Sequence, residues 1–119
     1  MPITEEIRQA AENLGKQLGA NPNVQDFVSL QKEVQQDARV VDLETRFALL
    51  NQKLAEREQT GGRLDRSVVE EYYELKDQVN DHPLIIARDY RLDIVKALFA
   101  QVAQRMTPIL GIEYTTFAL

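Results

Sequence analysis

His82 is the only histidine in this 119-residue sequence, and histidine is the side chain best suited to act as a general base or a metal ligand. A metal site would need further ligands, but the chain has no cysteine and lacks the Glu-x-x-His pairs of di-iron helical bundles. A polar residue between Asp81 and Pro83 suits the first turn of a helix. We therefore interpret His82 as structural, and we expect no metal and no other cofactor.

Neighbouring carboxylates could perform acid–base chemistry if burial separated their pKa values. The candidate pairs are Asp42 with Glu44, Glu70 with Glu71, and Asp89 with Asp93. Most of these residues lie off the apolar stripes of their helices, which indicates a solvated face. Asp89 and Asp93 lie on a more crowded helix, where Arg88 and Arg91 could pair within the helix or across a subunit interface.

Nucleophilic catalysis has little support in the sequence. Ser29 and Ser67 are the only serines, and neither lies in an elbow motif. The segment TGGR at 60–63 lacks the lysine, the spacing and the preceding strand of a phosphate-binding loop. We expect that the protein is not an enzyme and has no catalytic residue, and the enzymatic alternative left open is an acidic metal site at an oligomer interface.

The composition fits a soluble, cytoplasmic protein with a single domain over residues 1–119. Apolar residues make up 44% of the chain and charged residues 28%, and the formal net charge is −5. Negative charge disfavours direct binding to nucleic acid or to anionic lipid. No apolar run approaches the ~20 residues that span a bilayer, and the start of the chain is acidic where a signal peptide would be basic.

Between the prolines and glycines the apolar spacing is helical, so the predicted fold class is all-α, with about five helices and no strand. The helices should form a bundle with long hairpin-like helices that oligomerisation completes. The predicted helix starts are Thr4, Asn21 before Pro22, Asp37, a Ser67–Glu70 capping box, and Asn80 or Asp81 before Pro83. The predicted ends are Gly19, about Gln59 before the TGGRLD loop, and Thr107, where Pro108 should end or kink the last helix.

The predicted helix over 83–107 carries apolar residues on two sides, more than one contact with a core requires. One stripe contains Ala87, Tyr90, Ile94 and Leu98. The second stripe is the candidate oligomer interface, and it contains Leu92, Val95, Phe99, Val102 and Met106. Tyr73 lies off the stripe of its own helix and is a candidate partner surface. The apolar tail from Ile109 could pack on the same chain or on a second one.

Three segments together resemble one known family. They are FVSLQKEVQQD, VVDLETRFALLNQKLAEREQTGG and NDHPLIIARDYRLDIVKALFAQVAQRMTP, and the resemblance covers about Ala10 to Ile112. It is to the YlbF/YmcA family of small all-helical bacterial proteins, which includes YheA-type members. The resemblance implies a regulatory, oligomeric protein linked to competence, sporulation and biofilm formation. It also implies a complex that associates with a membrane-anchored ribonuclease and influences mRNA processing. Members proposed to hold an iron–sulfur cluster use cysteines, which this chain lacks.

The leading hypothesis is therefore a non-enzymatic regulatory or adaptor protein that acts through helical protein–protein contacts. Its expected partners are itself, as a homodimer or higher oligomer, and sister family proteins or a ribonuclease complex. Direct RNA binding is the main alternative, through a basic patch of Arg57, Arg63 and Arg66 around the glycine loop. The acidic balance of the chain argues against it, and no membrane insertion is expected.

Overall fold

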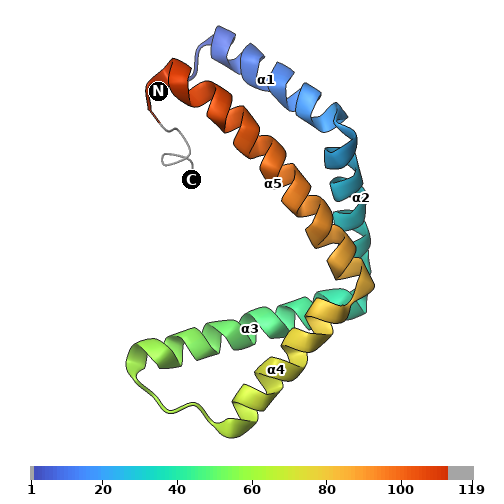
Figure 1. The fold of residues 1–119 in the computed structure, drawn as a ribbon, viewed down its shortest axis with the longest axis vertical. Helices are drawn as coiled ribbons and strands as arrows, with labels where there is room; N and C mark the ends of the chain where they lie inside the picture. The colour runs from blue at the N-terminus through green and yellow to red at the C-terminus, as the bar shows by residue number, and fades with distance from the viewer. Residues whose placement is uncertain (1, 113–119) are drawn as a thin grey trace. The chain divides into compact units, whose positions relative to one another are not determined.

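The computed structural model describes residues 2–112, and in that range it contains five helices and no strand (Figure 1). The helices are α1 (Glu5–Ala20), α2 (Pro22–Gln36), α3 (Ala38–Thr60), α4 (Arg66–Asp81) and α5 (Pro83–Leu110). The predictions of an all-α fold and of about five helices are confirmed. The apolar run IEYTTFAL at 112–119 lies almost wholly outside the described residues, and completion by oligomerisation stays a prediction.

Three of the predicted helix starts are confirmed by side-chain caps. The hydroxyl of Thr4 accepts a hydrogen bond from the backbone N–H of Ile7 at 3.2 Å. The Asn21 side chain accepts from the backbone N–H two residues later at 2.9 Å. The Asp37 carboxylate accepts from two backbone N–H groups of the first turn of α3, at 3.1 and 3.2 Å. Each cap satisfies donors that the helix leaves without a partner, so these starts follow from local sequence.

Two other boundaries differ from prediction because proline constrains the residue before it. Gly19 does not end α1, which runs to Ala20, and the extended residue is Asn21, directly before Pro22. His82, directly before Pro83, is likewise extended, so it separates α4 from α5 in place of Asn80 or Asp81. The proline ring clashes with a helical conformation at the preceding residue, which places both breaks one residue before a proline.

Two predictions about the ends of α4 and α5 are wrong. The Ser67 hydroxyl does not cap α4; Asp65 does, and its carboxylate accepts from the Ser67 backbone N–H at 3.4 Å. Pro108 does not end α5, which runs on to Leu110, and the alternative of a kink at this proline stays a prediction. The helix ends instead at Gly111, whose φ of 74° suits glycine.

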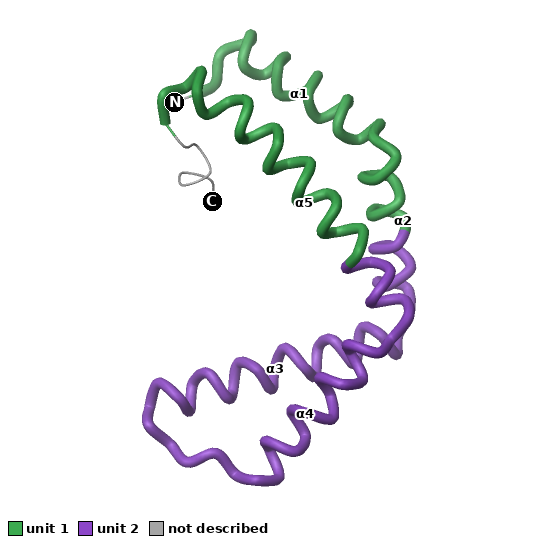
Figure 2. The backbone as a smooth tube through the Cα atoms, in the orientation of Figure 1, with its two compact units in different colours: residues 1–29, 90–119 green, residues 30–89 purple. Residues whose placement is uncertain are grey.

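The chain divides into two compact units (Figure 2): residues 1–29 with 90–119, and residues 30–89. Helices α2 and α5 each contribute to both units. The prediction of a single domain over 1–119 stays a prediction.

The unit of residues 30–89 has its own apolar core. Val34, Val40 and Ile85 are buried together, and the half-buried residues Leu43, Val79 and Leu84 pack against them. Further along the α3–α4 hairpin, Leu50 and Leu75 are buried. The rings of Phe47 and Tyr72 stack there with centroids 5.5 Å apart. The hairpin turns at Gly61, whose φ of 71° lies in the left-handed region that glycine adopts without strain. The TGGRLD loop prediction is confirmed.

The other unit has very little buried apolar surface. Among its described residues Val95 is the only buried hydrophobic residue, and α1 contains no buried residue at all. Nevertheless α1 carries an apolar stripe of Ile7, Leu14 and Leu18, of which Leu18 alone is half-buried. The face of α1 that the sequence marks as apolar is therefore left largely open to water.

Candidate interaction surfaces

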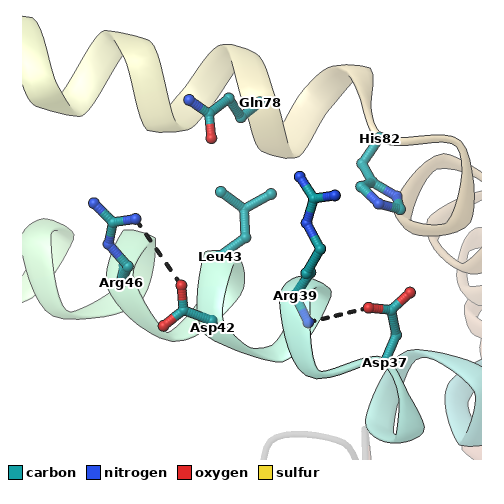
Figure 3. A pocket seen from close by; sticks show the side chains of 7 residues that line it. All are labelled: Asp37, Arg39, Asp42, Leu43, Arg46, Gln78 and His82. Atoms are coloured by element: carbon teal, nitrogen blue, oxygen red, sulfur yellow. Dashed lines mark hydrogen bonds and ion pairs between the residues drawn. The ribbon is translucent and has the colours of Figure 1, made fainter.

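His82 holds the junction between α4 and α5, and its imidazole takes part in a helix cap. The ring atom Nδ1 accepts a hydrogen bond from the backbone N–H of Leu84 at 3.2 Å, in the first turn of α5. The half-buried ring also borders an open hollow of about 350 Å³ (Figure 3). The hollow is lined by Asp37, Arg39, Asp42, Leu43, Arg46, Gln78 and His82.

Two arginines and two aspartates give this hollow its charges. The Asp37 carboxylate is engaged with backbone N–H groups, and Asp42 lies 3.9 Å from an Arg46 nitrogen. Figure 3 shows the Arg39 guanidinium extending from α3 into the space below α4, toward His82. Within residues 2–112 the Arg39 side chain forms no ion pair or hydrogen bond. The hollow thus offers hydrogen-bond donors that suit a carboxylate or another oxyanion.

The other carboxylates are not gathered for catalysis. Asp42, Glu70, Glu71 and Asp93 are exposed. In the described part of the chain, no group of three or more histidine, aspartate or glutamate side chains could hold a metal ion.

Glu44 and Arg88 form the best-shielded ion pair among the described residues. Arg88 donates from its two terminal nitrogens to the two Glu44 carboxylate oxygens at 2.9 and 2.6 Å, and its side chain is 14% exposed. Asp89 also accepts from Arg88 at 2.9 Å. The pKa of Arg88 is raised above its ordinary value, chiefly by the hydrogen bond with Glu44, while desolvation opposes the shift.

The predicted pairing within α5 therefore occurs at Asp89, but the principal partner of Arg88 lies 44 residues away in the sequence. Arg91 pairs with Asp26 of α2 at 3.6 Å rather than with Asp93. Both long-range partners lie on other helices, so no spacing rule could have found them.

The predicted oligomer interface on α5 is a mixed surface. Val95 is buried within the chain, Leu92, Val102 and Met106 are half-buried, and Phe99 is 47% exposed. On the first stripe of α5, Tyr90 is 63% exposed. A contact between subunits through these residues stays a prediction.

The exposed apolar face of α1 was not predicted from the sequence. Ile7 is 57% exposed and Leu14 is 38% exposed, although their spacing is that of a core-facing stripe. A helical stripe has the same spacing whether the chain itself or a partner covers it. The sequence therefore predicts the apolar stripe of α1 but not its exposure to water.

On the α3–α4 hairpin, Tyr73 is 57% exposed and its ring packs edge to face against the ring of Tyr72, with the two centroids 5.3 Å apart. Its role as a partner surface stays a prediction.

Of the three arginines considered for RNA binding, Arg66 pairs with Glu70 at 3.1 Å. This ion pair neutralises part of the charge that the basic patch would present to phosphate.

Comparison with known proteins gives one finding. A family model described as "Control of competence regulator ComK, YlbF/YmcA" matches residues 7–107. No curated protein sequence matches the chain significantly. Within residues 2–112 no helix combines the length and apolar character needed to cross a membrane.

Proposed function

The chain belongs to the YlbF/YmcA family, and on that basis we propose that it is a non-enzymatic regulatory adaptor that binds other protein chains through the apolar faces of α1 and α5. The observation that carries this proposal is α1 itself, an amphipathic helix of 16 residues with no buried residue. The family description supports a role in regulation. The resemblance noted above adds sister family proteins and a ribonuclease complex as candidate partners, beside a second copy of the chain.

An uncovered α1 would be poorly stable, which is the physical reason to expect a partner. Isolated helices shorter than about 12–15 residues are marginal in water, and α1, with 16 residues, is barely longer; most helices in proteins are stabilised by packing of an apolar face. On the polar side of α1, Arg8 bonds to Glu5 and to Glu12. Exposed pairs of this kind contribute little to helix stability, because water screens the charges. Covering Ile7 and Leu14 would add roughly 25 cal/mol for each Å² of apolar surface removed from water.

The proposed face extends over the described part of α5 in the same unit. Tyr90 and Phe99 are large, exposed and on the two stripes of that helix, and Ile109 and Leu110 are exposed at its end. Scattered exposed apolar residues are ordinary in proteins, but a concentration of them in a unit with one buried hydrophobic residue favours an interaction surface.

The proposal also accounts for the residues that might have carried chemistry. Of the candidate residues, His82 is used in a cap, Glu44 and Asp89 are paired with Arg88, and Glu70 is paired with Arg66. Each of these side chains has a structural partner, which supports a binding protein rather than a catalyst.

Substitution on α1 tests the proposal. In the double variant Ile7→Glu with Leu14→Glu, two exposed positions become charged, so the chain should stay helical but lose its associated form. The measurements are sedimentation equilibrium for mass and circular dichroism for helix content. The matched control, Gln9→Glu with Asn13→Asp, adds the same charge to the opposite face of α1 and should leave the mass unchanged.

The same pair of variants tests binding to other proteins. Tagged wild-type protein should recover partner proteins from its own cells after mild cross-linking, and the control variant should recover the same set. The Ile7→Glu, Leu14→Glu variant should lose them. Unchanged mass together with unchanged recovery would refute the assignment of this face.

A further inference from the structure

A row of basic side chains runs along α3 on the unit of residues 30–89. Arg39, Arg46 and Lys53 are spaced by seven residues, and Arg57 follows four residues later. Seven residues make almost two helical turns, so these exposed side chains repeat about every 10.5 Å along one side of the helix.

Three neighbouring hollows open beside this row, and together we call them the groove along α3. The first, of about 350 Å³, lies between Arg39 and Arg46. The second, of about 160 Å³, is lined by both Arg46 and Lys53, and the third, of about 400 Å³, by Lys53 and Arg57. Neighbouring hollows share one basic residue, first Arg46 and then Lys53, so all three open along the same stretch of α3.

The groove has apolar groups in its lining as well as charges. Leu43 lines the first hollow, and Leu49 and Leu50 line the second. Leu49 is 55% exposed beside the basic row. On the opposite wall α4 contributes Gln78 to the first hollow and Glu71 to the second. The third hollow is lined by polar and charged residues alone. In the first two hollows, leucines bordered by charge at seven-residue intervals match the pattern that receives an amphipathic helix.

The basic side chains are available for an incoming partner. In the described residues neither Arg39 nor Lys53 forms an ion pair, and Arg46 has only the exposed contact with Asp42 at 3.9 Å. A new carboxylate could therefore pair with these groups without displacing a strong existing bond.

Nucleic acid is a poorer occupant than an acidic peptide. Asp42, Glu56 and Glu71 also line the groove and would repel both occupants, but a phosphate backbone is charged at every nucleotide, whereas a helix can carry carboxylates only beside the basic residues. The apolar residues of the lining would gain nothing from phosphate. An acidic helix can place its carboxylates beside the basic row and its apolar side chains over Leu49, so it complements both features.

We propose that the groove along α3, bordered by Arg39, Arg46 and Lys53, is the docking site for an acidic amphipathic helix of a partner protein. This inference rests on the proposed function, because it names the chemistry of one partner of a protein-binding regulator. The partner helix carries glutamate or aspartate at seven-residue intervals and leucine-like side chains between them.

The test uses the full chain and a designed helical peptide of three heptads, about 21 residues, with glutamate at every seventh position and leucine facing the groove. Fluorescence anisotropy measures its affinity. The triple variant Arg39→Glu, Arg46→Glu, Lys53→Glu, called the row variant, reverses the charge of the three basic residues. The control Lys16→Glu, Lys96→Glu, Arg105→Glu makes the same charge change on exposed residues of the other unit.

We expect the acidic peptide to bind the wild type and the control equally, and to bind the row variant about tenfold more weakly or worse. A peptide with lysine in place of glutamate should not bind. Equal affinity for both variants would overturn the proposal, as would tighter binding of a single-stranded RNA that the row variant loses. If reversing the row instead lowers the mass in sedimentation, the groove is a contact between copies and the proposal is wrong.

These results are independent of the test of α1. If the peptide fails to bind while Ile7→Glu with Leu14→Glu still abolishes partner recovery, the adaptor function stands and the partner docks outside the groove. If the peptide binds but the α1 variant changes nothing, the groove stands without the α1 face.

Discussion

The ion pair between Glu44 and Arg88 offers the sharpest test of how the unit of residues 30–89 is held together. The substitution Glu44→Gln keeps the shape of the side chain but removes its charge and one of its two strong acceptors. Arg88, whose side chain is 14% exposed, then keeps its contact with Asp89 at 2.9 Å but loses its principal partner.

The expected loss follows from the burial and the geometry. Hydrogen bonds to charged groups contribute ~1.5–3 kcal/mol, and a shielded arginine without its partner also bears a desolvation cost. Asp89 offsets part of this loss, and the glutamine amide oxygen can still accept one bond. We therefore expect Glu44→Gln to lower the free energy of unfolding by about 1–2 kcal/mol.

Urea unfolding followed by circular dichroism measures this change. With a urea dependence of ~1–3 kcal/mol per molar for a small protein, the midpoint should fall by about 0.3–2 M. The matched control is Glu70→Gln, which weakens the pair with Arg66, a side chain that is 93% exposed. Exposed pairs contribute ~0–0.5 kcal/mol, so the control midpoint should hardly move.

Equal shifts in the two variants would refute the reasoning, because burial would then have no effect on the strength of the pair. A double-mutant cycle of Glu44→Gln with Arg88→Met gives a second measure. The interaction energy should be ~1 kcal/mol or more if the two side chains stabilise the fold as a pair. A value near zero would mean that the arginine acts through its aliphatic stem alone.

Three further predictions concern single residues. Ile85→Ala should cost about 2–5 kcal/mol of unfolding free energy by urea titration, whereas Ile86→Ala, at an exposed position, should cost under ~0.5. Gly61→Ala should cost about 1 kcal/mol by the same assay, since φ is 71°. The pKa of Glu5 lies below its ordinary 4.5, chiefly because of its hydrogen bond with Arg8. This contact is therefore present above pH 4.5 and is lost on acidification. In the variant Arg8→Gln, an NMR titration should show that the pKa of Glu5 rises toward its ordinary value.

Most helix boundaries were within reach of the sequence because caps and prolines act locally. Thr4, Asn21 and Asp37 each accept from a backbone N–H two or three residues ahead. The two breaks placed at the wrong residue precede Pro22 and Pro83, and the same short-range rule explains them.

The choice of cap for α4 could not be made from residue types alone. Asp65 and Ser67 are both good capping residues, and each has a plausible pattern after it. The backbone bonds decide the matter, because the carbonyl of Asp65 accepts from Val68 and Val69 at 3.1 Å and so starts the helix two residues before the predicted cap.

Local sequence was enough to predict the helical class, the approximate position of each helix and which side of each helix is apolar, since these depend on neighbours within a turn or two. Tertiary structure decided that Arg88 meets Glu44 across 44 residues, that the stripe of α1 is exposed, and that Arg39, Arg46 and Lys53 border a groove with α4. An apolar stripe on a helix indicates that the face will be covered, but what covers it depends on the packing of segments that are distant in the sequence.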